Sequence, residues 1–171
     1  MARQRYLFAA YFSTGVMIPM GYEYGFKQRL NVVQTRPQDW EAPAYDLSPF
    51  IKGVNRMKKN CPVLLEEGPQ ARVNPKGEPV ALLLKSRESR KGRILAVINT
   101  TGEPQEVAIP DLADLLGKPR RAWKDLTPDT IPLKLLGALE FTLPPARMRL
   151  FYNPDGAPLV LEDVKISGGE G

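Results

Sequence analysis

The hydrophobic pattern of the first 67 residues describes a part of a fold that cannot stand alone. Residues 2–12 favour a helix that is apolar nearly all round from Tyr6 to Phe12, which is typical of a helix buried on several sides. Residues 16–20 form a continuous apolar run, which predicts a parallel strand buried on both faces. An amphipathic helix follows over 48–61, with Ser48 as its N-cap and Pro49 as its first residue. Together they make one piece of an α/β repeat, whose single strand has no partner to pair with.

The remainder of the chain, from Gly68 onward, has a different pattern of short alternating segments separated by turns. In the last segment Met148, Leu150 and Tyr152 alternate with Arg147, Arg149 and Phe151, which predicts a sheet with one solvated face. Strands at this spacing are typical of an antiparallel β-sandwich. We therefore expect an α+β chain, with a helix–strand–helix unit in residues 1–67 and a β-sandwich in residues 68–171. The expected strands are 70–73, 79–86, 93–99, 105–109, 121–125, 139–143 and 147–152.

The composition excludes several kinds of catalytic site. The 171 residues include no histidine and one cysteine, Cys61, so the chain has no Ser–His or Cys–His nucleophile pair, no imidazole metal ligand and no internal disulfide. Cys61 fits a small apolar residue on the stripe of the second helix. The sequence contains no phosphate loop, dinucleotide fingerprint or metal-ligand spacing, so we expect no cofactor and no bound metal.

The net charge of +5 is spread along the chain. Two basic runs lie between expected strands, and we interpret both as solvated turns in preference to a nucleic-acid surface. The apolar stretch from Tyr6 to Met20 is interrupted at Ser13, which argues against a signal peptide or a membrane span, so we expect a cytoplasmic chain. The runs are Lys85, Arg87, Arg90, Lys91 and Arg93, and Lys118, Arg120, Arg121 and Lys124.

Candidate binding residues follow the predicted buried strand directly. Glu23, within the segment Gly21-Tyr22-Glu23-Tyr24-Gly25, can act as an acid, a base or an acceptor for a sugar hydroxyl, or it can bond loop backbone and hold the turn. Trp40, between Asp39 and Glu41, can stack on a sugar ring or pin the loop to the body of the protein. The same alternatives hold for Tyr22, with packing favoured. The candidate substrate-binding residues are therefore Tyr22, Glu23 and Trp40.

These residues, in this order, resemble the C-terminal part of an α-amylase superfamily glycoside hydrolase. Residues 15–25 are similar to the eighth strand of a (β/α)8 barrel with its Gly-x-Glu-x-Gly exit. Residues 47–61, with Asn55 and Lys58, are similar to the last barrel helix, and residues 68–161 to the β-sandwich that follows the barrel. The resemblance implies that residues 1–67 are a remnant of the barrel.

The resemblance also implies where the catalytic residues lie. Enzymes of this superfamily use an Asp nucleophile, a Glu acid/base and a further Asp on earlier barrel strands, together with a His-Asp pair, and none of these has a counterpart here. We therefore expect no catalytic residue in this chain and no activity from it alone. Its expected partners are the missing N-terminal barrel portion and, through the parent enzyme, an α-glucan or maltooligosaccharide. The identity of the glucan, and hydrolysis against transglycosylation, stay open.

Two alternatives compete with this interpretation. A non-catalytic carbohydrate-binding β-sandwich would need exposed aromatic side chains on one sheet face, for which Trp123, Phe141, Phe151 and Tyr152 are the candidates. A basic nucleic-acid-binding module would use residues 85–93, although no aromatic residue is interleaved with that run. An incomplete barrel exposes apolar surface, so we also expect poor solubility of the isolated chain.

Overall fold

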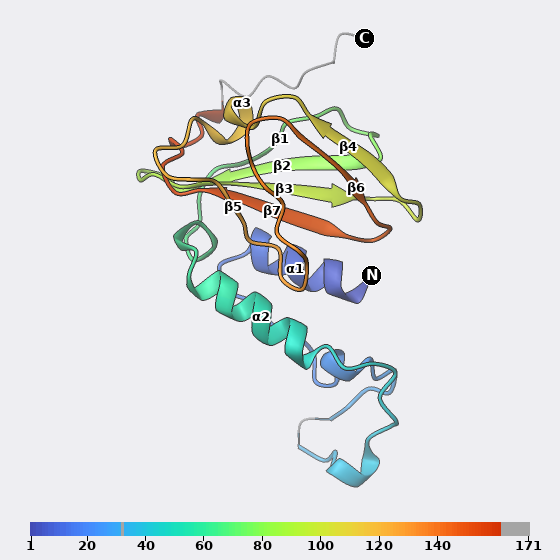
Figure 1. Ribbon diagram of the computed structural model, residues 1–171. Helices are drawn as coiled ribbons and strands as arrows, with labels where there is room; N and C mark the ends of the chain where they lie inside the picture. The colour runs from blue at the N-terminus through green and yellow to red at the C-terminus, as the bar shows by residue number, and fades with distance from the viewer. Residues whose placement is uncertain (32, 162–171) are drawn as a thin grey trace.

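The computed structural model describes residues 1–31 and 33–161, so the end of the predicted second unit, residues 162–171, lies outside the described part. The fold is α+β with antiparallel sheets. Helix α1 (Ala2–Phe12) lies against one face of a five-stranded sheet, and α2 (Ser48–Lys59) packs along α1 (Figure 1). Short 3-10 turns η1 (Tyr22–Tyr24), η2 (Pro37–Asp39) and η3 (Pro62–Leu64) lie in the connections.

The main sheet has the strand order β1-β2-β3-β7-β5, and a second, two-stranded sheet pairs β4 with β6. Neighbouring strands are antiparallel throughout, with Leu84 opposite Leu95 and Leu95 opposite Phe151 in register. The strands are β1 (Gln70–Arg72), β2 (Val80–Ser86), β3 (Arg93–Asn99), β4 (Gln105–Ile109), β5 (Lys124–Asp125), β6 (Leu139–Leu143) and β7 (Met148–Asn153). A short helix that the sequence analysis missed, α3 (Leu112–Leu116), begins at the capping residue Asp111 and follows β4.

The main sheet is buried on both faces. Ile94 and Leu150 face α1 and α2, whereas Leu95 and Phe151 face β4, β6 and α3. The prediction of one solvated face for 147–152 is therefore wrong at Phe151, which is fully buried and packs edge-on against Phe141, with 6.0 Å between the ring centroids. Alternation along β7 separates two apolar environments, because the β4–β6 pair covers the face that we expected to be wet.

Residues 16–20 do not form the predicted strand. No residue described between 13 and 20 belongs to a sheet, and Met17 is 96% exposed, while Val16 and Ile18 rest partly against the helical core. The physical reason is the absence of a neighbouring parallel strand, without which the backbone groups of this segment have no ladder to join. The second helix ends at Lys59, before the predicted end at Cys61, and Ser48 is its first residue, preceded by Leu47 at the N-cap.

Two buried lysines hold the C-terminal end of α1. The Lys58 ammonium donates hydrogen bonds to Ala10 O at 2.8 Å, to Ser13 O at 2.6 Å and to Leu64 O. Lys85 reaches Tyr11 O and Phe12 O, both at 3.3 Å. The expectation of a solvated Lys85 is wrong, because its side chain is fully buried in β2 and points at the negative end of the helix. Burial lowers the pKa of both lysines, and the charge of Lys85 lowers that of Lys58 further.

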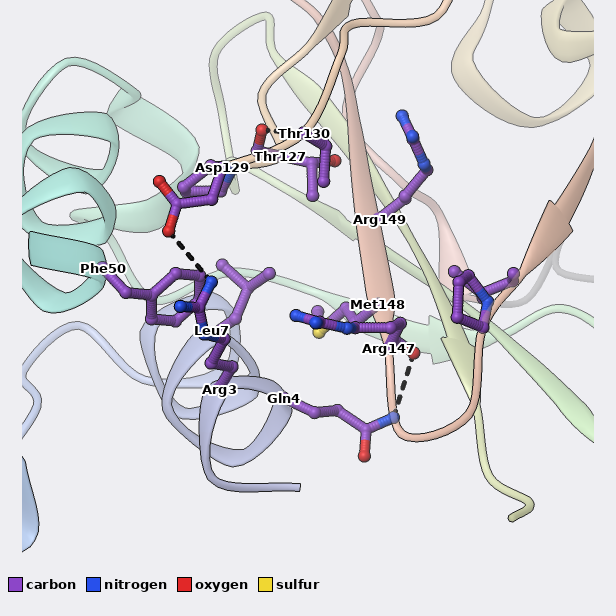
Figure 2. Close-up of a pocket in the computed structure, with 13 residues that line it drawn as sticks. Arg3, Gln4, Leu7, Phe50, Thr127, Asp129, Thr130, Arg147, Met148 and Arg149 are labelled. Atoms are coloured by element: carbon purple, nitrogen blue, oxygen red, sulfur yellow. Dashed lines mark hydrogen bonds and ion pairs between the residues drawn. The ribbon is translucent and has the colours of Figure 1, made fainter. Parts of the chain in front are cut away.

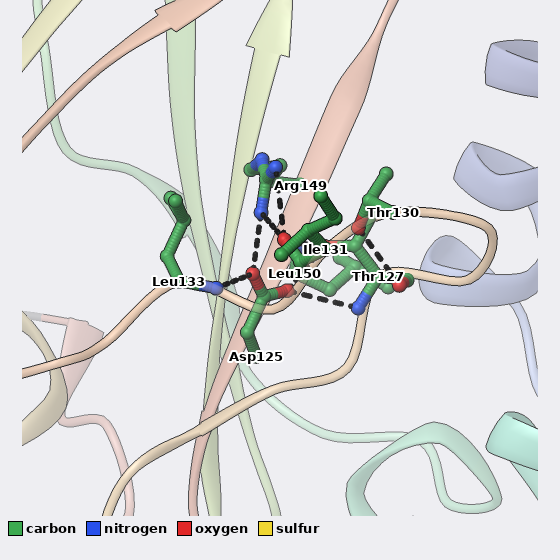
Figure 3. A network of polar contacts seen from close by, with 7 residues as sticks. All are labelled: Asp125, Thr127, Thr130, Ile131, Leu133, Arg149 and Leu150. Atoms are coloured by element: carbon green, nitrogen blue, oxygen red, sulfur yellow. Dashed lines mark hydrogen bonds and ion pairs between the residues drawn. The ribbon is translucent and has the colours of Figure 1, made fainter.

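A buried carboxylate organises the loop between β5 and β6. Asp125, whose side chain is 1% exposed, accepts hydrogen bonds from the Thr127 amide at 3.0 Å, the Thr127 hydroxyl at 2.5 Å and the Leu133 amide at 3.0 Å. It also pairs with the Arg149 guanidinium at 2.5 Å (Figure 3). The loop is therefore fixed at its base, and its tip reaches α1, where Asp129 pairs with Arg3 at 3.1 Å.

No helix in residues 1–31 or 33–161 is long and apolar enough to cross a membrane.

Candidate functional site

The turn that carries Tyr22 and Glu23 depends on two glycines in left-handed conformations. Gly21 (φ 82°) precedes η1 and Gly25 (φ 70°) ends it. A Cβ at Gly21 would lie 2.5 Å from the Phe26 ring, and one at Gly25 would lie 2.6 Å from the Tyr45 ring. Both the backbone angles and the space exclude larger residues, so the two glycines set the direction in which the Tyr22–Tyr24 turn leaves the helical layer.

Tyr22 is turned toward the helices. Its hydroxyl donates to Ala2 O at 2.8 Å, and its ring lies 6.3 Å from the Tyr6 ring. Burial raises the pKa of the Tyr22 hydroxyl. One edge of the ring still lines a recess of about 370 Å³ that also includes Gln28, Arg29 and Tyr45. Tyr22 thus packs against α1 and also lines this recess.

Glu23 lies on the opposite side of the turn. Its carboxylate lines an open recess of about 420 Å³ with Ser48, Lys52 and Asn55 of α2. In the described part of the chain no hydrogen bond reaches this carboxylate, so it does not bond loop backbone as one of the two alternatives supposed. Only its main-chain carbonyl fixes the turn, by accepting the Leu47 amide at 2.7 Å. Asn55, Ser48 and Lys52 share this recess with Glu23, and no second acidic residue among those described lines it.

Glu41, which we had considered only as a neighbour of Trp40, holds the long loop. One of its oxygens accepts the amides of Lys27 and Gln28, both at 2.6 Å. Residues 25–31 and 33–45 project away from the sheets at the foot of the molecule (Figure 1). A carboxylate that binds backbone amides across thirteen or fourteen residues leaves no periodic signal in the sequence, which is why this role was missed.

Trp40 stands in an aromatic cluster within this loop. Its ring lies 6.5 Å from Tyr24 and 6.0 Å from Phe26, and it remains 47% exposed. The indole packs on Tyr24 and Phe26 near the start of the loop, and the rest of its surface faces solvent. Trp40 lines neither the recess of Glu23 nor that of Tyr22, so the three candidate residues do not meet in one pocket.

The aromatic residues of the sandwich do not form an exposed platform. Phe151 is fully buried, Tyr152 is 9% exposed and packs toward the helices, and the Trp123 indole donates to Gly117 O at 3.2 Å. The basic run is also engaged within the fold. Arg87 forms an ion pair with Glu66, and Arg93 donates to the carbonyls of Leu115 at 2.9 Å and Ala157 at 3.1 Å.

The described residues contain no group of three or more His, Cys, Asp or Glu side chains that could hold a metal ion. Cys61 is 2% exposed, and burial raises the pKa of its thiol to about 11, so it is a poor nucleophile at neutral pH.

A helical layer packed on antiparallel sheets is the fold that this chain shares with several solved structures. The structure of AmyP in complex with maltotriose matches with a TM-score of 0.62 at 12% identity, over 91% of this chain and 35% of that chain. The α-amylase from Geobacillus thermoleovorans, complexed with acarbose, matches with a TM-score of 0.54 at 18% identity, over 89% of this chain and 33% of that chain. The resemblance to α-amylases is thus confirmed at the level of the fold.

The same fold occurs outside the α-amylases. Alpha-galactosidase I from Mortierella vinacea matches with a TM-score of 0.50 at 11% identity, over 92% of this chain and 37% of that chain. This chain therefore spans about a third of the length of the solved structures that it matches. No family model matches the sequence, and no curated protein matches it either.

Proposed function

We propose that this chain is the C-terminal part of an α-amylase-like glycoside hydrolase that acts on α-glucans. Residues 1–67 would complete a (β/α)8 barrel and residues 68–171 would form the β-sandwich that follows it. The observation that carries the proposal is the fold shared with AmyP over 91% of the chain, together with the Gly-x-Glu-x-Gly turn at the predicted strand exit.

The exposed side of the helical layer supports the proposal. Phe8 and Phe12 stack on each other with 5.6 Å between their centroids, and they are 36% and 53% exposed. Met17 and Met20, further along the chain, are 96% and 46% exposed. We call these four residues the apolar face. In a complete barrel, neighbouring strands and helices would cover such a surface, and residues 16–20 would gain strands with which to pair.

We further infer that the chain lines the substrate cleft without performing the chemistry. Glu23 faces α2 and has no second carboxylate beside it, whereas retaining and inverting hydrolysis both need a pair. The catalytic carboxylates would come from the missing barrel portion. Trp40 would offer its exposed part to a sugar ring, while Tyr22 and Glu23 would contact substrate from two separate recesses. The match to an α-galactosidase indicates that the fold alone does not select the sugar.

The coding sequence upstream of the Met1 codon tests this proposal. An open reading frame that continues upstream and encodes Asp and Glu residues at the ends of alternating strands would support it, and the completed enzyme should then release sugar from maltotriose. An in-frame stop codon with a ribosome-binding site directly before Met1 would overturn it. A carbohydrate-binding module would then be the alternative, and glucan pulldown with Trp40→Ala and Trp123→Ala would test that.

A further inference from the structure

A second hollow lies away from the candidate glucan residues, where the first turn of α1 meets the start of β7. It has a volume of about 240 Å³. Its walls bring together Arg3, Leu7 and Phe50 from the helices, Asp129 from the tip of the β5–β6 loop, and Arg147 and Met148 from the start of β7 (Figure 2). We call it the arginine pocket. It is assembled only because the loop fixed by Asp125 reaches across to α1.

The arginine pocket has one more positive charge than negative charges. Arg3 is neutralised by Asp129, and Arg149 at the edge is neutralised by Asp125. The Arg147 guanidinium lies across the hollow toward Leu7 and Arg3 (Figure 2), and it forms no hydrogen bond or ion pair within residues 1–31 and 33–161. Only the main-chain carbonyl of Arg147 is engaged, accepting from the Gln4 amide group at 3.0 Å. One positive charge is therefore free to bind an anion.

The pocket walls add an apolar surface to this charge. Leu7 and Met148, 3% and 4% exposed, are among the residues that line it, and the Arg3 guanidinium lies over the Phe50 ring at 5.1 Å. A guanidinium at the edge of an apolar hollow suits a ligand with one flat anionic end and an apolar body.

Backbone strain is concentrated at the same place. Within the described residues, Asp129 (φ 56°) and Ala146 (φ 51°) are the non-glycine residues with positive φ. Asp129 lines the arginine pocket and Ala146 immediately precedes Arg147. The left-handed conformation is unfavourable for Ala146, whereas an aspartate tolerates it in turns. Both positions lie next to charged groups of the hollow, the Asp129–Arg3 pair and Arg147.

We propose that the arginine pocket binds a small organic carboxylate, a monoanion with an apolar body. The carboxylate would accept two parallel hydrogen bonds from the Arg147 guanidinium, and its body would lie on Leu7 and Met148. A carboxylate is favoured over a phosphate dianion because Asp129 stands beside Arg3, so the pocket has room for one negative charge and repels a second. The proposal goes beyond the proposed function and does not depend on it.

Benzoate and benzyl alcohol, which have the same ring and differ in charge, are the probes for this proposal. Binding is followed by chemical-shift titration of the full chain, with inorganic phosphate as a third ligand. We expect saturable binding of benzoate with shifts confined to α1 and the start of β7, at least about tenfold tighter than binding of benzyl alcohol and weakened by salt. Equal binding of the two ring compounds, tighter binding of phosphate, or no saturable binding of benzoate would each overturn the proposal.

The Arg147→Gln variant tests the assigned residue. Because the Arg147 side chain is exposed and only its main chain is hydrogen-bonded, the variant should unfold at the same temperature as the original chain. We expect it to weaken benzoate binding at least about tenfold. Arg147→Lys should be intermediate, because an ammonium keeps the positive charge but cannot donate two parallel hydrogen bonds to one carboxylate. Arg120→Gln, an exposed arginine near the opposite end of β7, is the matched control and should leave binding unchanged. Equal binding by Arg147→Gln and Arg120→Gln would refute the assignment.

Discussion

Asp125 is the single residue on which the β5–β6 loop depends most. Replacing it with alanine leaves the Thr127 and Leu133 amides and the Arg149 guanidinium without their shared acceptor. We expect Asp125→Ala to lower the free energy of unfolding by about 3 kcal/mol, the range for breaking one side of a buried ion pair. Urea denaturation measures this, with the exposed Asp114→Ala as control. A shift no larger than that of the control would show that the network contributes little.

Cys61 should make the free energy of unfolding fall as the pH rises through the alkaline range. Burial raises the pKa of its thiol from 9.0 to about 11, so the folded chain keeps a proton that the unfolded chain releases. The resulting stabilisation is present below pH 9 and is lost between about pH 9 and 11, by up to about 2.7 kcal/mol. Urea unfolding of the original chain and of Cys61→Ala should therefore give free energies that converge over this interval. Tyr11, Lys58 and Lys85 titrate in both proteins, and a constant difference would contradict the prediction.

Ala146 carries backbone strain that a glycine would relieve. Its φ of 51° is unfavourable for a residue with a Cβ, whereas glycine adopts it freely. We expect Ala146→Gly to raise the free energy of unfolding by about 0.5–1 kcal/mol. This is the net effect, once the larger entropy loss of glycine on folding is subtracted from the strain that is relieved. Thermal unfolding measures the change, and Ala122→Gly, at an exposed position without positive φ, should stabilise nothing. A loss of stability in Ala146→Gly would mean that the Ala146 side chain makes contacts that outweigh the strain.

At the scale of elements, α1 depends on groups that are distant in sequence. Lys58 donates to three carbonyls around the C-terminal end of α1. Lys58→Met should leave these carbonyls without a donor and lower the free energy of unfolding by about 3 kcal/mol. Urea denaturation gives the loss, and hydrogen exchange should show faster opening of the last turn of α1. The adjacent Lys59 is exposed, and Lys59→Met should change stability by less than about 0.5 kcal/mol. Similar losses in both variants would mean that the buried bonds are not what stabilises the helix end.

Helices and strands that are defined by their own local hydrophobic pattern were predicted well from the sequence. The bounds of α1, β3, β4 and β6 agree with expectation, because alternation or a helical run bounded by turn residues defines each locally. The strand at 16–20 failed because a strand also needs a neighbour, which the local pattern cannot supply. The expectation for Lys85 failed because a lysine at the end of an apolar run was assigned to a solvated turn, while its hydrogen-bond partners lie more than seventy residues earlier, in α1.

At the scale of the whole molecule, the layer order could not be read from the sequence. That β4 and β6 leave the main sheet and cover Phe151 follows from long-range pairing, and so does the meeting of α1, the Asp129 loop and the start of β7 at the arginine pocket. The Tyr22–Glu23 turn was found from its glycines, whereas its orientation was not. Tyr22 and Glu23 line different recesses, and the Tyr22 side chain is held at the helices by its bond to the Ala2 carbonyl, a contact twenty residues away in sequence.

The apolar face gives the molecule as a whole a tendency to associate. Phe12 and Met17 are exposed on it, and burying such side chains against a second copy or another partner is favourable. We expect the isolated chain to self-associate at micromolar to millimolar concentration, and the double variant Phe12→Lys, Met17→Lys to weaken that association at least about tenfold. Sedimentation velocity over a concentration series measures it.

The matched control for this prediction uses two other exposed apolar residues. Ile131 and Leu136, both 87% exposed, lie in the β5–β6 loop and are not part of the apolar face. If the apolar face drives association, the double variant Ile131→Lys, Leu136→Lys should associate as the original chain does, because it adds the same charge elsewhere. If both double variants become monomeric alike, added charge alone explains the effect. A monomeric original chain would mean that the apolar face does not drive self-association, and the strongest physical reason for a missing barrel portion would be lost.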